Sequence, residues 1–482
     1  MKKRQNVLPS AWDHETDVLI IGYGCAGTAA AIEAHDAGAD VLVIDKNLVA
    51  GGTTPMAGGI ILGAGTSVQR AQGITDTAEE MYRYFRAVGQ GLDDPDLARV
   101  YCENSGPNIE WLIGLGMEFT KLVMSGAENY PEYAAITPPK PRGHETGGKG
   151  RFFKVLKNAC DSRGIQCLYR TELKSLLTGP EGEVVGIEAE SEGASLCIRA
   201  RKAVVLACGG YASNPEMLKQ YSFDKGYRAT YTGSVYHTGD GINAARMLGA
   251  DLRCMGPIVP IPAVLRPGRR MARIAGPHRS TGGPFGMIIV NRAGKRFTDE
   301  SGFYIHVAGD MLLPGNLPNY LVFDARLRNA GKFNWPPWSG KSNSDIEDGT
   351  TSEAATIREL AAKIGVDPDA LEETVDNYNR NAGRGADPEF GKTRNLAPLD
   401  TPPFYAFERI VGIASTLGGL RIDTSSRVID VNGAVIRRLY AAGETTGGAL
   451  GANYPASGTA LQNAICFGRI AGTKAAAENP WE

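Results

Sequence analysis

The sequence predicts an α/β fold in which a parallel sheet is built from both ends of the chain, with an α+β domain inserted between them. One observation is a strand, a glycine-rich turn, a helix and a second strand that follow one another within residues 17–45. Another is a pair of apolar runs, at residues 201–210 and 438–444, that end at or beside glycine. Short apolar runs that stop at glycine are typical of buried strands in parallel sheets.

The chain has 482 residues, more than a single domain of ~150 residues needs. Because the predicted sheet takes strands from both chain ends, the middle must be an insertion. We therefore expect a nucleotide-binding domain at residues 14–266 and 404–482 and an inserted second domain at residues 267–403. An amphipathic stretch at residues 352–381 supplies helices for the second domain.

Composition and charge exclude several classes of protein. Lysine and arginine number 51 and aspartate and glutamate 53, so the net charge of −2 lacks the basic excess that nucleic-acid binding requires. No run reaches the ~18 apolar residues of a membrane-spanning helix. The basic N-terminus is not followed by the apolar core of an export signal. We therefore expect a soluble protein of the cytoplasm.

The cysteines and histidines argue against disulfide and metal sites. The eight cysteines include no C-x-x-C pair, and several lie in apolar strings, which fits a reducing compartment. The six histidines show no H-x-x-H or H-E-x-x-H spacing, so no metal site is expected. No serine lies in a G-x-S-x-G motif, which excludes the commonest hydrolase.

Residues 22–27 form a G-x-G-x-x-G motif between the first strand and the first helix. Gly22 would make the tight turn, Gly24 would let the backbone approach a pyrophosphate, and Gly27 would let the helix pack on the strand. Asp45 follows Gly27 by 18 residues, close to the ~20 expected for an acid that binds a ribose. Since a helix N-terminus attracts anions, the motif predicts a Rossmann-like dinucleotide site.

Four stretches together resemble the flavoprotein family of fumarate reductases, succinate dehydrogenase flavoprotein subunits and 3-ketosteroid dehydrogenases. They are residues 17–59, 203–214, 290–301 and 416–472, and they occur in the family's order. The resemblance implies FAD bound across the Rossmann-like domain, with the cap domain closing over the flavin. Covalent members use a histidine after the second strand, where residues 53–56 offer none, so noncovalent FAD is expected.

The resemblance also implies which residues contact the cofactor. Glu444 matches an acidic contact to the flavin ribityl or ribose, and residues 447–461 should bring backbone N–H groups toward the flavin pyrimidine ring. The full implied set is Gly22, Gly24, Cys25, Ala26, Gly27, Asp45, Lys46, Gly52, Thr53, Thr54, Gly58, Gly59, Ala207, Gly209, Asp240, Gly443, Glu444, Ser457, Thr459, Ala460 and Leu461.

Departures from the fumarate reductase pattern indicate a different substrate. Fumarate reductases carry a substrate-binding histidine where this chain has Ser415, and a substrate-binding arginine where it has Tyr454. A dicarboxylate needs charged, bidentate donors, and a tyrosine has neither the paired N–H groups nor the positive charge of an arginine. Arg328 lies where the family includes the fumarate reductase proton donor, but a structural ion pair explains an arginine there equally well.

The replacements resemble 3-ketosteroid dehydrogenases. The resemblance implies Tyr304 as the proton acceptor and Tyr454, with the N–H of Gly458, as the group that binds the substrate ketone. Ser457 is an auxiliary donor by the same comparison. A phenol and a main-chain N–H suit this task, because the carbonyl oxygen gains negative charge as the α-proton leaves. Tyr130 or Tyr133 is a further candidate for a relay tyrosine, although a surface loop accounts for both.

The expected function is therefore an FAD-dependent desaturase of the 3-ketosteroid dehydrogenase type, acting on the 4,5 or the 1,2 bond and using an external electron acceptor. The substrate would be a steroid or another cyclic ketone. One alternative is an ene-reductase of the fumarate reductase type that acts on an unsaturated substrate other than a dicarboxylate. Another is an electron-transfer subunit without a substrate site of its own.

Overall fold

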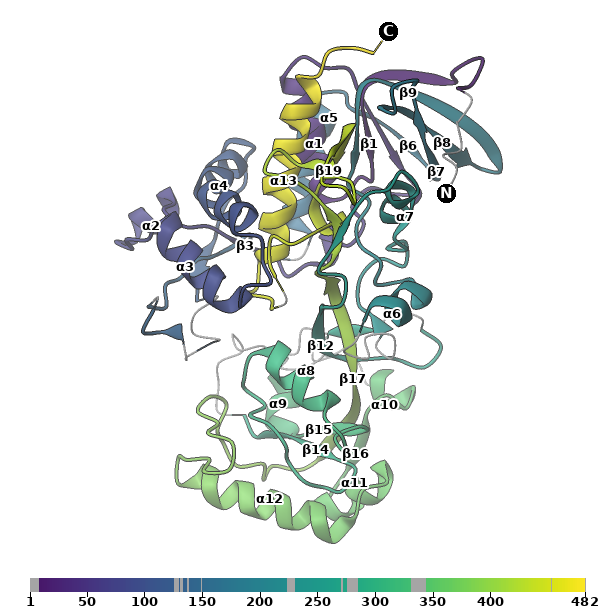
Figure 1. Ribbon diagram of the computed structural model, residues 1–482. Helices are drawn as coiled ribbons and strands as arrows, with labels where there is room; N and C mark the ends of the chain where they lie inside the picture. Colours follow the sequence, from purple (N-terminus) through teal and green to yellow (C-terminus); the bar gives the residue numbers. More distant parts are fainter. Residues whose placement is uncertain are drawn as a thin grey trace. The chain divides into compact units, whose positions relative to one another are not determined.

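The computed structural model describes residues 8–124, 130, 133–136, 138–148, 150–222, 230–269, 272–274, 285–330, 344–451 and 453–481 (Figure 1). The chain divides into two compact units. Unit 1 contains Met1–Asp224, Gly233–Ile258 and Ser415–Glu482, and unit 2 contains Lys225–Thr232 and Val259–Ala414. Unit 2 extends beyond the expected 267–403 at both ends, because most of β12 (Ile258–Val264) and β17 (Phe404–Thr416) belongs to its sheet.

The main sheet of unit 1 is the expected parallel sheet with strands from both chain ends. Its strand order is β19-β20-β9-β1-β2-β6, and all neighbours from β20 to β6 are parallel. The strands are β1 (His14–Ile21), β2 (Val41–Asp45), β6 (Gln166–Tyr169), β9 (Ala194–Leu206), β19 (Arg427–Ile429) and β20 (Val435–Ala441). The α/β fold class is thus confirmed, and the carboxyl ends of β1, β2, β9 and β20 share one edge, where such sheets bind ligands.

Three helices pack beside this sheet in Figure 1: α1 (Cys25–Asp36), α5 (Arg151–Ser162) and α13 (Thr459–Ala476). The contact between α1 and α13 is close because glycines lie in it. A Cβ on Gly468 would lie 2.6 Å from the carbonyl oxygen of Ala26, and one on Gly472 would lie 2.2 Å from that of Ala30. The two N-termini therefore lie at the same end of the helix pair.

The remaining elements of unit 1 are shorter. A hairpin of β7 (Thr171–Thr178) and β8 (Val184–Ser191) extends the main sheet, and two three-stranded sheets have the orders β11-β18-β21 and β3-β5-β4. Their bounds are β3 (Ile60–Leu62), β4 (Lys121–Val123), β5 (Gly143–Glu145), β11 (Leu252–Arg253), β18 (Gly419–Arg421) and β21 (Thr446–Gly447). The helices are η1 (Thr54–Met56), α2 (Ser67–Ala71), α3 (Ala78–Gly89), α4 (Pro95–Gly114), α6 (Pro215–Tyr221), α7 (Asp240–Met247) and η5 (Gly443–Thr445).

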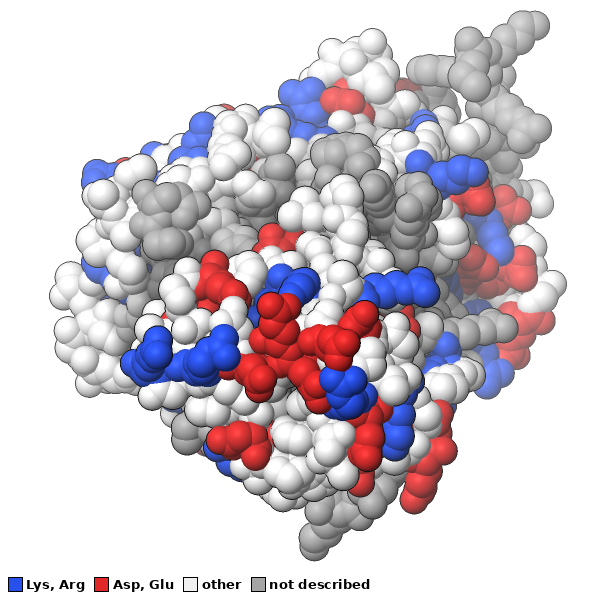
Figure 2. Space-filling view, turned by 90° about the horizontal axis from the view of Figure 1, so that it is seen from below, with Lys and Arg blue, Asp and Glu red and all other residues white. Residues whose placement is uncertain are grey.

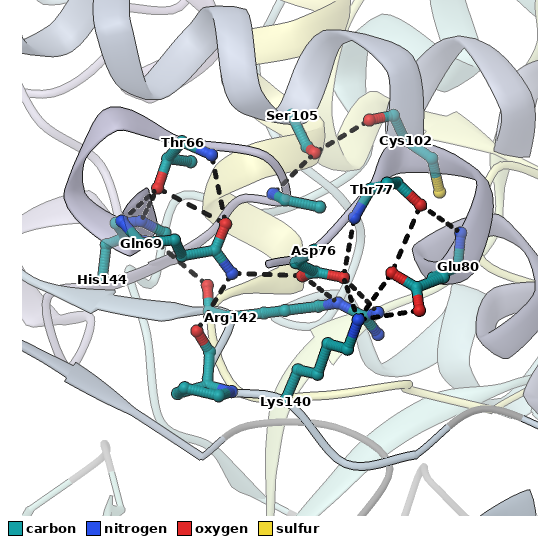
Figure 3. A network of polar contacts seen from close by, with 12 residues as sticks. Thr66, Gln69, Asp76, Thr77, Glu80, Cys102, Ser105, Lys140, Arg142 and His144 are labelled. Carbon is teal, nitrogen blue, oxygen red and sulfur yellow. Dashed lines mark hydrogen bonds and ion pairs between the residues drawn. The ribbon is translucent and has the colours of Figure 1, made fainter. Parts of the chain in front are cut away.

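A buried polar network ties α2, the start of α3 and β5 together (Figure 3). Arg142 makes two 2.8 Å hydrogen bonds to the fully buried carboxylate of Asp76. Gln69 donates to the same carboxylate at 3.1 Å. His144 donates from Nδ1 to the Arg142 carbonyl at 2.9 Å, so its Nε2 accepts the Thr66 hydroxyl at 2.8 Å. Each buried polar group thus has a partner, which makes this region a rigid support.

Unit 2 is built on a sheet of order β13-β12-β17-β15-β14, with β10 and β16 also paired to β17. Successive residues on its strands enter two separate cores: Ile289 and Phe323 face one, and Ile288 and Val322 face the other. The further strands are β10 (Thr230–Tyr231), β13 (Arg273–Ile274), β14 (Met287–Asn291), β15 (Asn319–Asp324) and β16 (Ser352–Ala354). The helices are α8 (Tyr304–Leu312), α9 (Ala325–Asn329), α10 (Ser344–Glu347), α11 (Ile357–Ile364) and α12 (Pro368–Gly383).

The surface seen in Figure 2 carries acidic and basic side chains next to one another. Arg358 of α11, for example, pairs with Glu372 of α12 at 2.6 Å, and Lys295, in the turn after β14, pairs with Glu373 of α12 at the same distance. Interspersed charges of this kind are typical of a solvated face. Among the described residues, no helix is both long enough and apolar enough to cross a lipid bilayer.

Candidate functional site

The glycine-rich turn after β1 joins the strand to α1, and its three glycines meet different surroundings. Gly22 has φ +103°, and a Cβ there would lie 2.5 Å from the carbonyl oxygen of Ala207. A Cβ on Gly27 would lie 1.9 Å from the carbonyl oxygen of Gly22. A Cβ on Gly24 would meet no protein atom closer than 3.6 Å. Gly22 and Gly27 are therefore required by the fold, whereas the protein itself would accept a side chain at position 24 in ordinary van der Waals contact.

A second turn lies against the start of α1. The N–H of Gly51 donates to the carbonyl of Tyr23 at 2.9 Å, and Thr54 Oγ1 accepts the N–H of Cys25 at 3.0 Å. A Cβ on Gly58 would meet nothing within 4 Å. The two turns are thus held together by hydrogen bonds, and Gly58 borders open space.

Asp45, at the end of β2, holds the backbone around it. Its two carboxylate oxygens accept the N–H groups of Tyr23 and Asn47, each at 2.8 Å. The next residue, Lys46, pairs with Asp240 and donates to Thr238. The acid expected at a ribose therefore also fixes the glycine-rich turn, and Lys46 links β2 to the first residue of α7.

Glu444 lies in η5, directly after β20. Its Oε1 accepts the N–H of Thr416 at 2.8 Å and the Thr416 hydroxyl at 3.0 Å. Its Oε2 lies 3.6 Å from Nδ1 of His237. A Cβ on Gly210 would lie 2.7 Å from Glu444 Oε1, so the glycine pair after β9 makes room for this carboxylate.

His237 was not singled out from the sequence, and it lies at the centre of these turns. Its Nε2 is 3.3 Å from Thr53 Oγ1, and a Cβ on Gly209 would lie 2.6 Å from the ring. Burial lowers the pKa of His237 below its ordinary value, although the Glu444 carboxylate opposes that shift. The available signal was its position just before the Thr-Gly-Asp-Gly turn of residues 238–241.

The N-terminus of α13 carries the second group of candidate residues. Gly458 caps the helix with φ +97°, and a Cβ there would lie 2.9 Å from the carbonyl oxygen of Ile60. The phenol oxygen of Tyr454 accepts the N–H of Ala460 at 3.1 Å. Tyr454 is buried and Ser457 is half-buried. The Tyr454 ring therefore lies back along the first turn of the helix, with its oxygen at the end where N–H groups point outward.

Tyr304 lies in unit 2, as the first residue of α8. The loop before it is fixed by a buried ion cluster: Arg296 binds both oxygens of Glu300, at 2.8 and 2.9 Å, and both oxygens of Asp387. Lys392 lies 3.3 Å from Glu300. The sequence stretch that carries the family resemblance at residues 290–301 thus has a structural task, which is to hold the start of α8.

Arg328 and Ser415 differ in their surroundings. Arg328 makes hydrogen bonds of 3.0 and 3.1 Å to the two oxygens of the fully buried Asp345. Ser415 is buried and donates to the carbonyl of Thr416 at 3.1 Å. The ion pair that the sequence left open for Arg328 is present.

Comparison with known proteins decides the family. A family model described as "FAD binding domain" matches residues 17–461. The chain belongs to this FAD-binding family. It is 33% identical over 480 residues, 98% of this chain and 79% of the relative, to the fumarate reductase (cytochrome) of Shewanella frigidimarina. It is 28% identical to the 3-oxosteroid 1-dehydrogenase of Mycobacterium tuberculosis over 95% of this chain and 97% of that protein.

Solved structures support the same conclusion. One is the 3-ketosteroid-delta4-(5alpha)-dehydrogenase of Rhodococcus jostii RHA1 in complex with 4-androstene-3,17-dione, which is 31% identical. The match has a TM-score of 0.75 and covers 99% of this chain and 100% of that one. The protein is thus an FAD-dependent oxidoreductase of the fumarate reductase family, and its cofactor is FAD.

The residues of unit 1 are suited to bind FAD. The residues that the sequence assigned to FAD lie in the turns after β1, β2, β9 and β20, at the start of α7 and at the start of α13. A Cβ on Gly24 would meet Gly51 O and Thr54 Oγ1 no closer than 3.6 Å, and one on Gly58 would meet nothing within 4 Å, so both glycines allow the close approach that a pyrophosphate requires. Near the start of α13, Gln462 is fully buried, and within the described part of the chain its side-chain amide has no hydrogen-bond partner. Sequence reasoning missed Gln462, because an amide inside a helix gives no local signal.

Proposed function

We propose that this FAD-dependent oxidoreductase desaturates a carbon–carbon bond next to a ketone, and that its substrate is a 3-ketosteroid or a similar cyclic ketone. The observation that carries the proposal is the environment of Tyr454, whose phenol oxygen accepts the Ala460 N–H. We further propose noncovalent FAD in unit 1, with unit 2 as the cap and catalytic domain. The eight cysteines are all unpaired, which supports a reducing compartment such as the cytoplasm.

The position of Tyr454 suits a neutral carbonyl better than a carboxylate. Its oxygen accepts the Ala460 N–H, and we assign its own O–H as the donor to the substrate carbonyl. A phenol hydrogen and the backbone N–H of Gly458 would stabilise the negative charge that develops on a ketone oxygen when the α-proton leaves. Ser457 is the auxiliary donor in the same turn.

Tyr304 would take the α-proton. It occupies the first position of α8. Bound FAD would supply the hydride acceptor for the β-carbon. The substrate thus loses one proton and one hydride and gains one double bond, and an external acceptor reoxidises the cofactor.

The second candidate function is reduction of an unsaturated substrate, which the 33% identity to a fumarate reductase favours. In that case Arg328 would be the residue to test as proton donor. Its two hydrogen bonds to Asp345 support a structural role instead. We therefore rank desaturation of a ketone first.

Anaerobic titration of the oxidised enzyme with saturated and 4-ene 3-ketosteroids tests the proposal. We expect the flavin absorbance to bleach, and the steroid that works identifies the bond. Tyr304→Phe should abolish bleaching, whereas the control Tyr320→Phe, a half-buried tyrosine on β15, should leave it intact. Absence of bleaching, together with reoxidation of the reduced enzyme by fumarate or another unsaturated acid, would assign the protein to the reductases.

A further inference from the structure

Three tyrosines of unit 1 donate hydrogen bonds to backbone carbonyls in the turn before α13 and at the first residue of that helix. They come from the segment before β5, from α3 and from α4, far from this turn in sequence. The bonds run from Tyr130 to the carbonyl of Tyr454 at 3.1 Å, from Tyr84 to that of Pro455 at 2.6 Å, and from Tyr101 to that of Thr459 at 3.2 Å. The carbonyls of this turn are therefore fixed by side chains.

The peptide group between Thr459 and Ala460 is bound at both of its ends. Its carbonyl accepts the Tyr101 hydroxyl at 3.2 Å, and its N–H donates to the phenol oxygen of Tyr454 at 3.1 Å. In a planar trans peptide the carbonyl and the N–H point in opposite directions. Tyr101 and Tyr454 thus lie on opposite sides of one peptide group and are connected through it.

We propose that Tyr101 is a positioning residue that acts through this peptide group to hold and polarise Tyr454 as a hydrogen-bond donor; this rests on the proposed ketone-binding role of Tyr454. Hydrogen bonds in a chain strengthen one another, because each donor that is polarised becomes a better donor to the next group. The Tyr101 hydroxyl polarises the peptide carbonyl, the peptide N–H becomes a stronger donor, and the Tyr454 phenol becomes more acidic.

The surroundings of Tyr101 suit a permanent donor. Its side chain is fully buried, and its ring lies 4.9 Å from that of Phe85. Burial raises the pKa of Tyr101 well above its ordinary value, so its hydroxyl keeps its hydrogen at any working pH. The peptide group that it contacts is in the first turn of α13, where the helix dipole adds to the polarisation of the N–H.

Tyr84 provides a matched control. Its hydroxyl also donates to a carbonyl of the turn, but that carbonyl belongs to Pro455, and the bond to the Tyr454 oxygen comes from Ala460. Tyr84→Phe and Tyr101→Phe both remove one buried phenol-to-carbonyl bond. Only Tyr101→Phe removes it from the peptide group that contacts Tyr454.

The test uses the FAD-loaded enzyme labelled with ¹³C at Cζ of tyrosine, with the Tyr454 resonance assigned by its loss in Tyr454→Phe. In Tyr101→Phe we expect the Tyr454 resonance to shift and its titration to move to higher pH, while in Tyr84→Phe both stay as in wild type. Site-specific 3-fluorotyrosine at position 101, a stronger donor, should move the resonance in the opposite direction. If Tyr101→Phe and Tyr84→Phe leave Tyr454 equally unchanged, the inference is wrong.

A second measurement separates this inference from the proposed function. Binding of 4-androstene-3,17-dione, followed by the perturbation of the flavin spectrum, should weaken in Tyr101→Phe by about threefold to tenfold, as expected for a partly lost polarisation. If the ketone does not bind to the wild-type enzyme, the proposed function is wrong, and so is the purpose assigned to the hydrogen-bond chain from Tyr101 to Tyr454. The Tyr454 resonance still decides whether Tyr101 polarises Tyr454.

Discussion

Substitution by alanine should affect folding stability at Gly27 and FAD affinity at Gly24, two glycines of the same motif. In Gly27→Ala the new Cβ would lie 1.9 Å from the backbone oxygen of Gly22, so strand and helix must separate by about 1 Å. Overpacking of this kind costs ~1–3 kcal/mol, and we expect the upper end because the opposing atom is backbone. In Gly24→Ala the Cβ meets nothing closer than 3.6 Å, and φ of −88° suits alanine. Its apoprotein should therefore stay within about 0.5 kcal/mol of wild type.

FAD binding should instead be weakened by the substitution at Gly24. If the pyrophosphate approaches the backbone at Gly24, a methyl group there costs ~1–3 kcal/mol of binding, about a tenfold to hundredfold loss of affinity. Urea unfolding of the apoprotein, followed by circular dichroism, measures the first effect, and FAD titration by flavin fluorescence measures the second. The reasoning is refuted if Gly24→Ala binds FAD like wild type, or unfolds as easily as Gly27→Ala.

Three further predictions concern buried polar groups. Burial lowers the pKa of His144 from 6.5 to about 4, so folding stability should fall by about 3 kcal/mol as pH drops from 6.5 to 4. Urea titrations at several pH values measure this dependence, and His144→Gln should flatten it. Glu300→Gln leaves the Arg296 charge undercompensated and should cost ~3–5 kcal/mol of unfolding free energy by denaturant titration; a cost below ~1 kcal/mol would contradict the role of the cluster. Gln462→Leu removes an unpartnered buried amide, so it should raise apoprotein stability by ~1–3 kcal/mol while weakening FAD binding in the same titration. Gln69→Leu, a buried glutamine with partners, should instead lose stability, and equal behaviour of both would refute the reasoning.

The parts of the molecule that follow from local pattern could be predicted from the sequence. The strand, turn and helix at residues 14–36 follow the spacing of the G-x-G-x-x-G motif. The clashes that a Cβ would create at Gly22 and Gly27 explain why the motif needs glycine at these positions. His237 and Tyr101 could not be predicted in the same way. Their partners lie 184 and 358 residues away, and such contacts depend on how strands and helices pack.

The domain boundaries show the same limit. The inserted region was expected to begin where the composition changes, near residue 267, but its sheet already includes β12. Strand β12 is as apolar as the strands of the main sheet, because unit 2 also buries both faces of its sheet. Two buried sheets in succession give no contrast in hydrophobicity, so only strand pairing separates them.

Charged side chains in each of the two units are already bound within the protein, and this bears on the proposed choice of substrate. The Asp45 and Glu444 carboxylates accept backbone N–H groups, and Arg328 is bound to a buried aspartate. Drawing Arg328 toward a dicarboxylate would leave that aspartate buried without its partner, at a cost of several kcal/mol. A ketone makes no such demand, because the phenol of Tyr454 and a backbone N–H can stabilise its oxygen without breaking an ion pair. The Arg328–Asp345 ion pair thus supports the proposal of a neutral substrate.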